Sequence, residues 1–349
     1  MHSEAKSGIG KQFDDYTLSG RHNFVTQAKG FGIILVIIGH FVSYNYMPPA
    51  MESIRLWIYS FHMPLFMILS GFLFGHTLRR SQGKLMLRTF IGKKFKRLII
   101  PYFFVSASIL LLNYALHTLL HIEVKSGANI ATDLLRMTYE NVGGSNVFLW
   151  FLYTLFLIFV ISATVLRLGN IGKYLLPLLA LLLFFTPLPE TFYLSSVGHY
   201  LIHFCIGMGL YTASQRYKGN YNTLLALLIA TSILLHLYLL TLPSSDILHF
   251  TRSLLATVGF LGLFYLLSIR HRLPSLHMMG QYSAHIYLLH MAGIHPIRII
   301  YDYIGIYTPA TFFVALSCAV VCGILFPILF TRYVVNRSRL LSFLLGGKS

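Results

Sequence analysis

The chain has 349 residues, of which 56% are hydrophobic and only 11% are charged. Soluble domains carry roughly 25% charged residues, so this composition excludes an ordinary soluble protein. The formal net charge of +17 would indicate a nucleic-acid partner in a soluble chain, but in a membrane protein it indicates basic cytoplasmic loops that face anionic lipid. The apolar runs are about 20 residues long and continuous, which predicts spanning α-helices rather than the alternating strands of a β-barrel.

Ten apolar segments, taken in chain order, are predicted to be membrane spans. They cover residues 31–47, 54–76, 98–119, 147–166, 174–187, 197–212, 222–242, 251–268, 281–300 and 309–331. The polar residues 1–28 contain no n-region and h-region ahead of a cleavage site, so we expect a cytoplasmic N-terminal segment and no signal peptide. The predicted organisation is this segment, a transmembrane domain over residues 29–332 and a cytoplasmic tail over residues 333–349.

The distribution of Lys and Arg predicts how these spans are oriented. With an even number of spans both termini lie on one side, and that side receives 22 of the 27 basic residues. The opposite side holds only Arg55, Lys125, Arg136, Arg252 and Arg298. Because basic residues favour the cytoplasmic face, we predict an all-α polytopic transmembrane bundle of about ten spans with both termini cytoplasmic.

His40 is the most informative residue of the first span. It lies in an apolar run, Phe31 to Val42, that has no other ionisable side chain, and Lys29 precedes it by eleven residues. An imidazole at membrane depth is costly and by default marks a functional site, and its charge can change near neutral pH. At 1.5 Å per residue His40 would lie ~16 Å above Lys29, near the midplane of the bilayer or beyond it. The pattern predicts a base inside the membrane with a cation at the cytoplasmic mouth.

Two later spans carry histidines at a comparable predicted depth. His62 is followed by Pro64, which should kink the second span, and by Ser70 in a small Ser-Gly pair that lets another helix or a ligand approach. In the ninth span Tyr287 and His290 are spaced i, i+3 and share a helix face. Any one of these histidines could be a packing residue with a hydrogen-bond partner. Three at similar depth predict a polar site within the membrane.

Other polar and aromatic residues fit structural functions. His199 and His203 are spaced i, i+4, as are His117 and His121, and this spacing can chelate a metal. No acidic partner completes a zinc-protease motif, so we predict interfacial residues and no metal site. Trp150 begins the fourth span, where it fits an aromatic belt at the outer interface or a stacking surface for a substrate.

The loop after the second span is the most basic stretch of the chain. It contains Arg79, Arg80, Lys84, Arg88, Lys93, Lys94, Lys96 and Arg97. Such a cluster anchors the cytoplasmic face of a membrane protein, and it could also clamp the phosphate groups of a cytosolic ligand. The two functions are compatible.

Five sequence blocks, in one order, resemble the bacterial membrane acyltransferase-3 superfamily, which O-acylates sugars and glycans. Residues 29–40 (KGFGIILVIIGH) resemble its motif of a basic residue, a ten-residue gap and a histidine. Residues 61–66 (FHMPLF) with 70–72 (SGF) resemble the second motif in its fucose-4-O-acetylase-like form, and 94–102 (KFKRLIIPY) the paired-arginine motif. Residues 149–152 (LWFL) and 286–290 (IYLLH) fit further blocks, and the resemblance extends from residue 22 to about residue 330.

The resemblance implies a reaction and a location. Acyl-coenzyme A would bind at the cytoplasmic face as a co-substrate, with no permanently bound cofactor, and its acyl group, by default acetyl, would pass to a hydroxyl of a sugar or polysaccharide at the outer side. The protein would be a multi-pass component of the bacterial inner membrane, in contact with lipid and with polysaccharide-biosynthesis machinery. The implied site residues are the catalytic His40 and Lys29, the donor-binding Lys94, Arg97 and Tyr102, and His62, Ser70, Trp150, Tyr287 and His290, which would bind or orient the acceptor.

Two other functions fit the same features. A transporter or flippase for an exopolysaccharide or a lipid-linked glycan would also have many spans, broken helices and midplane histidines. No internal repeat is visible in the sequence, which disfavours a transporter. A subunit of a polysaccharide synthase, with vestigial polar sites, is the third possibility.

Overall fold

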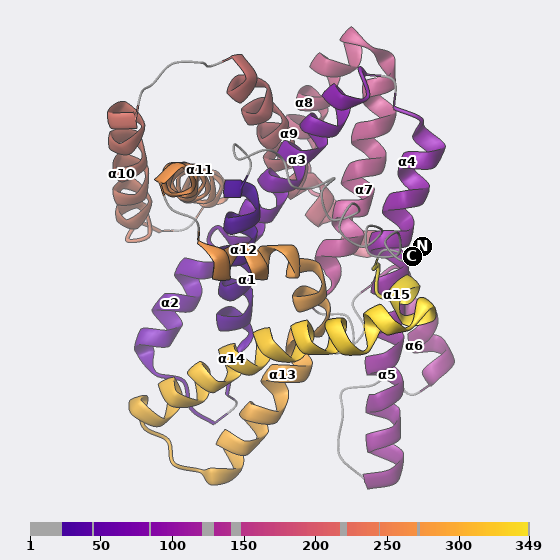
Figure 1. Cartoon of the computed structure of the whole chain (residues 1–349), viewed down its shortest axis with the longest axis vertical. Helices are drawn as coiled ribbons and strands as arrows, with labels where there is room; N and C mark the ends of the chain where they lie inside the picture. Colours follow the sequence, from indigo (N-terminus) through magenta and orange to yellow (C-terminus); the bar gives the residue numbers. More distant parts are fainter. Residues whose placement is uncertain are drawn as a thin grey trace, which may run out of the picture. The chain divides into compact units, whose positions relative to one another are not determined.

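The computed structural model describes residues 23–43, 45–83, 85–120, 129–140, 148–216, 222–243, 245–270 and 273–347 (Figure 1). These residues form helices, turns and irregular segments and no strand, so the predicted all-α fold class is confirmed. Most of the predicted N-terminal segment, residues 1–22, lies outside the described residues, as do Lys84 of the basic loop and His121.

The helical elements of the described residues are, in chain order, α1 (Asn23–His40), α2 (Pro49–Tyr59), α3 (His62–Arg80), α4 (Leu87–Lys94), the π-helix η2 (Phe95–Ile99), α5 (Ile100–Leu120), α6 (Ile130–Arg136), α7 (Trp150–Val165), the 3₁₀ turn η3 (Leu166–Leu168), α8 (Asn170–Phe185), the 3₁₀ turn η4 (Thr191–Tyr193), α9 (Leu194–Arg216), α10 (Asn222–Leu239), α11 (Asp246–Arg270), α12 (Pro274–Gln281), α13 (Ser283–Ile304), α14 (Pro309–Tyr333), the 3₁₀ turn η5 (Val335–Arg337) and α15 (Arg339–Leu344).

Six helical stretches of the described residues are long and apolar enough to cross a membrane. They are Asn23–His40, Pro49–Arg80, Leu87–Leu119, Trp150–Leu168, Asp246–Ser268 and Pro309–Arg337. The other four predicted spans also coincide with helices: α8 and α10 are apolar but shorter, and α9 and α13 are 23 and 22 residues long with more polar side chains. A multi-pass helical protein is therefore established, while the number of ten spans stays a prediction.

The first span ends earlier than predicted. We expected a helix to residue 47, and α1 ends at His40. The Ser43 hydroxyl accepts the backbone N–H groups of Asn45 and Tyr46 at 3.2 and 3.3 Å, an alternative to helical hydrogen bonds. Pro48 and Pro49 follow, and the residue before a proline avoids the α-helical region. His40 therefore terminates its helix instead of lying within it.

The predicted distortion at Pro64 takes the form of a complete break one turn earlier. Helix α2 ends at Tyr59, and α3 begins at His62 after a turn at Ser60 and Phe61. The ring of a proline clashes with the carbonyl of the residue four positions before it, which is Ser60 here. The predicted ninth span, residues 281–300, begins at a second break, because Tyr282 separates the short α12 from α13.

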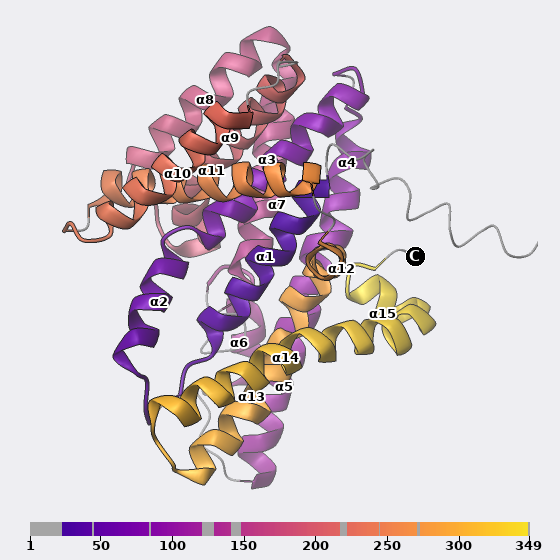
Figure 2. The same cartoon turned by 60° about the vertical axis from the view of Figure 1, so that its left-hand side comes forward.

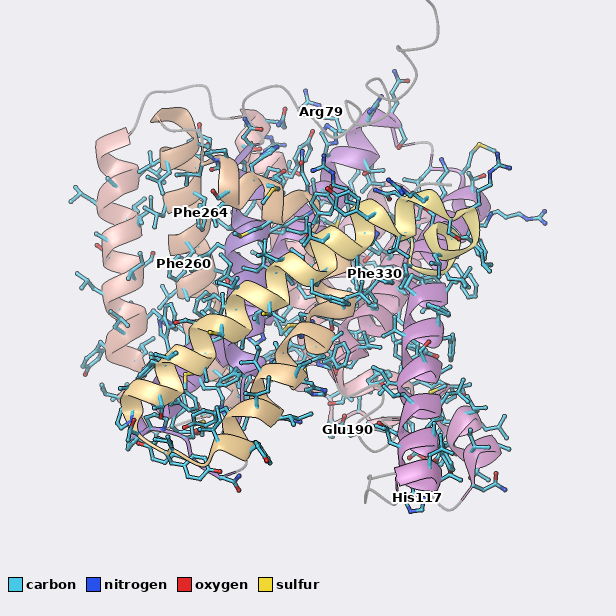
Figure 3. The ribbon with its side chains drawn as sticks, turned by 60° about the horizontal axis from the view of Figure 1, so that its bottom comes forward. Arg79, His117, Glu190, Phe260, Phe264 and Phe330 are labelled. Carbon is cyan, nitrogen blue, oxygen red and sulfur yellow. The ribbon has the colours of Figure 1, made fainter. Side chains whose placement is uncertain are left out.

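The described helices belong to two compact units. The first takes its residues from Met1–Phe66 and Lys218–Ile328, and the second from Met67–Tyr217 and Leu329–Ser349. In the first unit α1 contacts α2, α11, α12 and α13, and α10 packs along α11 (Figure 2). Phe31 of α1 packs against Phe260 and Phe264 of α11, with ring centroids 5.0 and 5.3 Å apart. Figure 3 labels the two phenylalanines of α11.

Glycines bring α1 and α12 into backbone contact within the first unit. A Cβ atom on Gly30 would lie 2.0 Å from the carbonyl oxygen of Leu276, and one on Gly280 would lie 1.8 Å from that of Thr26. Small residues at helix interfaces allow this approach in membrane proteins. The contact fixes the segment of α1 that carries Lys29.

The second unit has an aromatic core. Phe74, Phe90, Phe159 and Phe204, from α3, α4, α7 and α9, pack with ring centroids 5.4 to 5.8 Å apart. Beside them α3 and α9 touch through glycine, since a Cβ atom on Gly71 would lie 2.0 Å from the carbonyl oxygen of Phe204. The close helix approach predicted at the Ser-Gly pair is therefore confirmed.

Two glycines of α9 offer a test of this packing. A Cβ atom on Gly207 would lie 2.0 Å from the carbonyl oxygen of Ile68, whereas one on Gly209 would meet nothing within 4 Å. We expect Gly207→Ala to destabilise the protein by about 2 kcal/mol or more, because a backbone carbonyl cannot move aside easily. Gly209→Ala should leave stability unchanged or raised. The midpoint of thermal unfolding in detergent measures both, and equal midpoints would contradict the packing.

Candidate active site

His40 forms a defined hydrogen bond at the end of α1. Its side chain is partly exposed, and its Nδ1 lies 2.7 Å from the carbonyl oxygen of Val36. A carbonyl oxygen only accepts, so Nδ1 carries the proton of this bond, and in the neutral ring the lone pair belongs to Nε2. His40 therefore presents Nε2 as the atom that can take up a proton or attack a carbonyl carbon.

His290 of α13 lies against His40. The two ring centroids are 5.0 Å apart with an interplanar angle of 75°. His290 is fully buried, and its Nδ1 donates to the carbonyl oxygen of Tyr287 over 2.8 Å. The Tyr287 ring packs beside the imidazole at 6.2 Å. The structure thus brings together three of the sequence-predicted residues, with His40 accessible and His290 behind it.

His62 is connected to the same turn of α1 through Tyr59. His62 is buried, and its Nδ1 donates to the carbonyl oxygen of Ile58 over 2.9 Å. Tyr59 packs its ring 5.2 Å from that of His62 and donates its hydroxyl proton to the carbonyl oxygen of Gly39 over 2.8 Å. Sequence reasoning missed Tyr59. Its i, i+3 spacing from His62 was a signal, but the expected helix continued through this point.

Lys29 lies at the other end of the same helix face. Eleven residues of α-helix make three turns plus about 20°, so Lys29 and His40 project from nearly one side of α1, ~16 Å apart along its axis. The side chain of Lys29 is partly exposed. The structure therefore retains the predicted alignment of a cation and an imidazole on one helix.

In the second unit, Lys94 packs inward. Its Nζ lies 3.8 Å from the ring centroid of Phe159 and 5.3 Å from that of Phe90. A lysine ammonium within about 6 Å of a ring face makes a cation–π interaction. The aromatic core therefore orders this side chain.

Arg97 has a different environment from Lys94. It is exposed, like Lys96, and lies within the π-helix η2. Pro101 explains this irregularity, because its ring removes a backbone donor and clashes with the Arg97 carbonyl four residues earlier. Such π-helical segments are frequent at functional sites.

Tyr102 and Ser70 are less exposed than Arg97. Tyr102 is fully buried, and its hydroxyl donates to the carbonyl oxygen of Met137 over 2.9 Å and lies 3.1 Å from the hydroxyl of Tyr193. Ser70 lies half-buried on α3. The predicted donor-binding residues Lys94, Arg97 and Tyr102 therefore do not form one exposed patch. The Tyr102 side chain is buried, and its hydroxyl bonds to the Met137 carbonyl instead of reaching the surface.

Trp150, at the start of α7, is partly exposed and stacks on Tyr200 with centroids 5.4 Å apart. It lines a cavity of the second unit together with Tyr193. The sequence left an aromatic belt and a substrate-stacking surface as alternatives for Trp150, and the residues that surround it in this cavity were not predictable from its local sequence. Among the described residues no three His, Cys, Asp or Glu side chains are grouped so as to hold a metal ion.

These features define a class of protein: a helical membrane protein in which a lysine and a histidine share one helix and a second histidine packs against the first. A family model described as an acyltransferase domain, of the acyltransferase-3 type, matches residues 22–332. The chain therefore belongs to the acyltransferase-3 family of membrane acyltransferases.

A curated relative is the nodulation protein NolL of Mesorhizobium japonicum, which is 27% identical to this chain over 172 residues. The similarity covers 46% of this chain and 40% of NolL, so the match spans less than half of either protein. No solved structure matches the chain.

Proposed function

We propose that the protein is an integral-membrane O-acyltransferase, which moves an acyl group, by default acetyl, from acyl-coenzyme A to a hydroxyl of a sugar or polysaccharide. The observation that carries the proposal is the His40 ring, whose Nδ1–H is held by the Val36 carbonyl and which packs against His290. An imidazole fixed in one tautomer is suited to general-base or nucleophilic catalysis.

The reaction needs one proton transfer and one exchange of bonds at the thioester carbonyl. Nε2 of His40 takes the proton of the acceptor hydroxyl, the hydroxyl oxygen attacks the carbonyl carbon, and the coenzyme A thiolate leaves and receives that proton. In the covalent variant Nε2 first attacks the thioester carbonyl carbon, and the C–S bond breaks to release the coenzyme A thiolate. The acceptor oxygen then attacks the acyl-imidazolium, the C–N bond breaks to restore Nε2, and the acceptor proton passes to the thiolate. Both variants use the same nitrogen of His40.

The proposed arrangement in the membrane follows the charge distribution. Ten spans with both termini in the cytoplasm would place the exposed cations of α4 and η2, including Arg97, on the cytosolic side of a bacterial inner membrane. Acyl-coenzyme A carries several phosphates, for which arginine supplies bidentate hydrogen bonds. The acceptor would then be used at the outer side.

Transfer of radiolabelled acetyl from coenzyme A to a glycan by the purified protein in liposomes tests the proposal. Label in the glycan is the expected result. Movement of unmodified glycan across the liposome membrane, with no label transferred, would instead establish a transporter.

Charge reversal at Arg97 tests donor binding. We expect Arg97→Glu to raise the apparent KM for acetyl-coenzyme A about tenfold, with a smaller change in kcat, because one charge-assisted contact to phosphate becomes repulsive. Lys173→Glu is the matched control, since it makes the same change in net charge at another exposed cation of the predicted cytoplasmic side. An unchanged KM in Arg97→Glu would reduce the basic cluster to a determinant of topology.

A further inference from the structure

The second unit contains an open pocket of about 290 Å³, called the cavity below, that the histidine site does not use. Small-molecule pockets measure roughly 300–1,000 Å³, so this one suits a small ligand and not a whole coenzyme A. Its lining residues come from the segment after α6, the start of α7 and the η4–α9 junction, and they are Glu140, Trp150, Glu190, Thr191, Tyr193 and Ser196. Glu190 is labelled in Figure 3.

The chemistry of this lining matches a ring that bears hydroxyl groups. Two carboxylates accept O–H groups in charge-assisted hydrogen bonds. The indole of Trp150 is partly exposed and is held by stacking on Tyr200, so it provides an ordered apolar surface for C–H groups. Thr191 and Ser196 add hydroxyls that both donate and accept. A pyranose has these alternating apolar and polar faces.

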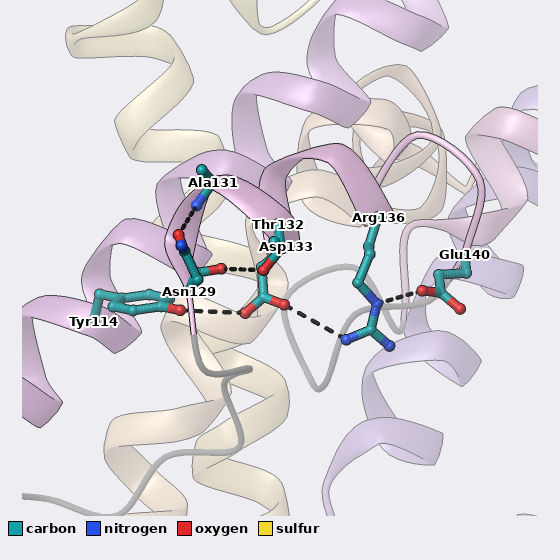
Figure 4. Close-up of polar contacts among 7 residues, drawn as sticks. All are labelled: Tyr114, Asn129, Ala131, Thr132, Asp133, Arg136 and Glu140. Atoms are coloured by element: carbon teal, nitrogen blue, oxygen red, sulfur yellow. Dashed lines mark hydrogen bonds and ion pairs between the residues drawn. The ribbon is translucent and has the colours of Figure 1, made fainter.

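Glu140 is held in place before any ligand binds. Its carboxylate accepts a hydrogen bond from Nε of Arg136, whose Nη1 lies 3.6 Å from the buried carboxylate of Asp133 (Figure 4). This bond to Glu140 raises the pKa of Arg136. Asn129 caps the first turn of α6 by accepting the backbone N–H of Ala131 over 2.8 Å. The network therefore fixes the Glu140 carboxylate, and the Arg136 guanidinium compensates its charge.

The η4 turn, which carries the lining residues Thr191 and Tyr193, has a strained backbone. Phe192 and Tyr193 have φ angles of +55° and +56°, a left-handed conformation that is unfavourable for bulky residues. The N–H of Phe192 donates to the carbonyl oxygen of Tyr139 over 2.6 Å, and the hydroxyl of Tyr102 joins Tyr193 to the carbonyl of Met137. Strain of this kind persists where surrounding contacts over-determine it, and it clusters at ligand sites.

The cavity lies on the helix that also contacts the cation of the donor motif. Trp150 precedes Phe159, whose ring lies under the Lys94 ammonium, by nine residues of α7. This spacing is ~14 Å along the helix axis. Helix α7 therefore connects a pocket for a small polar ring to the basic segment that we assign to the donor.

We propose that this cavity binds one pyranose ring of the acceptor and selects a neutral sugar over an acidic one, because two carboxylates line it and, among the described residues, an arginine pairs with Glu140 and none pairs with Glu190. That the bound sugar is the acceptor of acyl transfer rests on the proposed function. Tyr102 is then a positioning residue of the acceptor pocket, since its hydroxyl holds Met137 and Tyr193 together.

The chain has only two tryptophans, Trp57 and Trp150, so fluorescence can report on the cavity. In the full-length Trp57→Phe protein, we expect saturable quenching of Trp150 emission by methyl α-glucopyranoside or methyl α-fucopyranoside, and none by methyl glucopyranosiduronic acid. Glu190→Gln in this background should weaken the neutral glycoside about tenfold, the value of a lost charge-assisted hydrogen bond, and should admit the acidic one. The Trp150→Phe protein, which keeps Trp57, is the control and should not respond.

Saturation-transfer NMR of the same glycosides with wild-type protein repeats the measurement if Trp57→Phe is unstable. Lack of binding by either neutral glycoside, or equal binding in wild type and Glu190→Gln, would overturn the proposal. The binding assay contains no acyl donor, so its outcome is independent of acyl transfer. Sugar binding without label transfer from acetyl-coenzyme A would contradict only the proposed function, whereas label transfer with an unchanged acceptor KM in Glu190→Gln would contradict only the pocket.

Discussion

Replacing His40 with alanine is expected to lower the rate of acyl transfer by about a thousandfold or more, because it removes the Nε2 atom that takes the acceptor proton or carries the acyl group. The side chain is partly exposed at the end of α1, so its removal leaves no large cavity and the protein should remain folded. Initial rates of label transfer from acetyl-coenzyme A, with size-exclusion profiles of the purified variant, measure both expectations.

His117→Ala is the matched control, since His117 is an exposed histidine of α5 that the site does not use. It should transfer label at the wild-type rate. Wild-type rates in purified His40→Ala would remove His40 from the mechanism.

The same variant separates the two forms of the mechanism. If His40 carries the acyl group, wild-type protein mixed with labelled acetyl-coenzyme A and no acceptor should retain one label after rapid quenching, and His40→Ala should retain none. A general base forms no covalent intermediate, so wild-type protein would then remain unlabelled while still transferring acetyl to added acceptor.

Replacing His290 should also have a large effect, because this fully buried ring backs His40 at 5.0 Å and sets its orientation. We expect His290→Ala to lower kcat about a hundredfold, as a displacement of the reacting group by about 1 Å can do. His290→Phe keeps an aromatic ring in the same space but removes both nitrogens. His290→Gln keeps a polar group near the position of Nε2.

The three substitutions together define what His290 contributes. If a ring nitrogen of His290 is needed, the kcat of His290→Phe should be as low as that of His290→Ala, and His290→Gln should recover part of the wild-type kcat. If only packing matters, Phe should be close to wild type, which would contradict a polar function for His290. In a His40→Ala background the loss from His290→Ala should nearly disappear, because residues that act as a unit are not additive.

Several features of the fold were predictable from local sequence. The continuous apolar runs gave the helical class and placed a helix at every predicted span, because burial in lipid requires each backbone group to be satisfied within its own segment. A distortion near Pro64 was predictable from proline geometry, but the turn at Ser60 and Phe61 was not. The turn at Ser43 was not predictable. The hydrogen bonds that form it run from the backbone to the Ser43 hydroxyl, and the apolar pattern is equally compatible with a helix that continues through this residue.

For the candidate site too, some features were predictable from local sequence and others were not. The sequence by itself determined which residues are candidates for chemistry: the lone imidazole of His40 in an apolar run, Lys29 three turns earlier on the same helix, and the histidines His62 and His290 of two later spans. Only the tertiary structure decided that His40 ends its helix, that His290 packs against it, that Tyr59 joins His62 to α1 and that Glu140 and Glu190 share a cavity with Trp150. The physical reason is that helical periodicity fixes which face a residue occupies, whereas the partner of that face depends on glycine contacts and breaks between segments far apart in the chain.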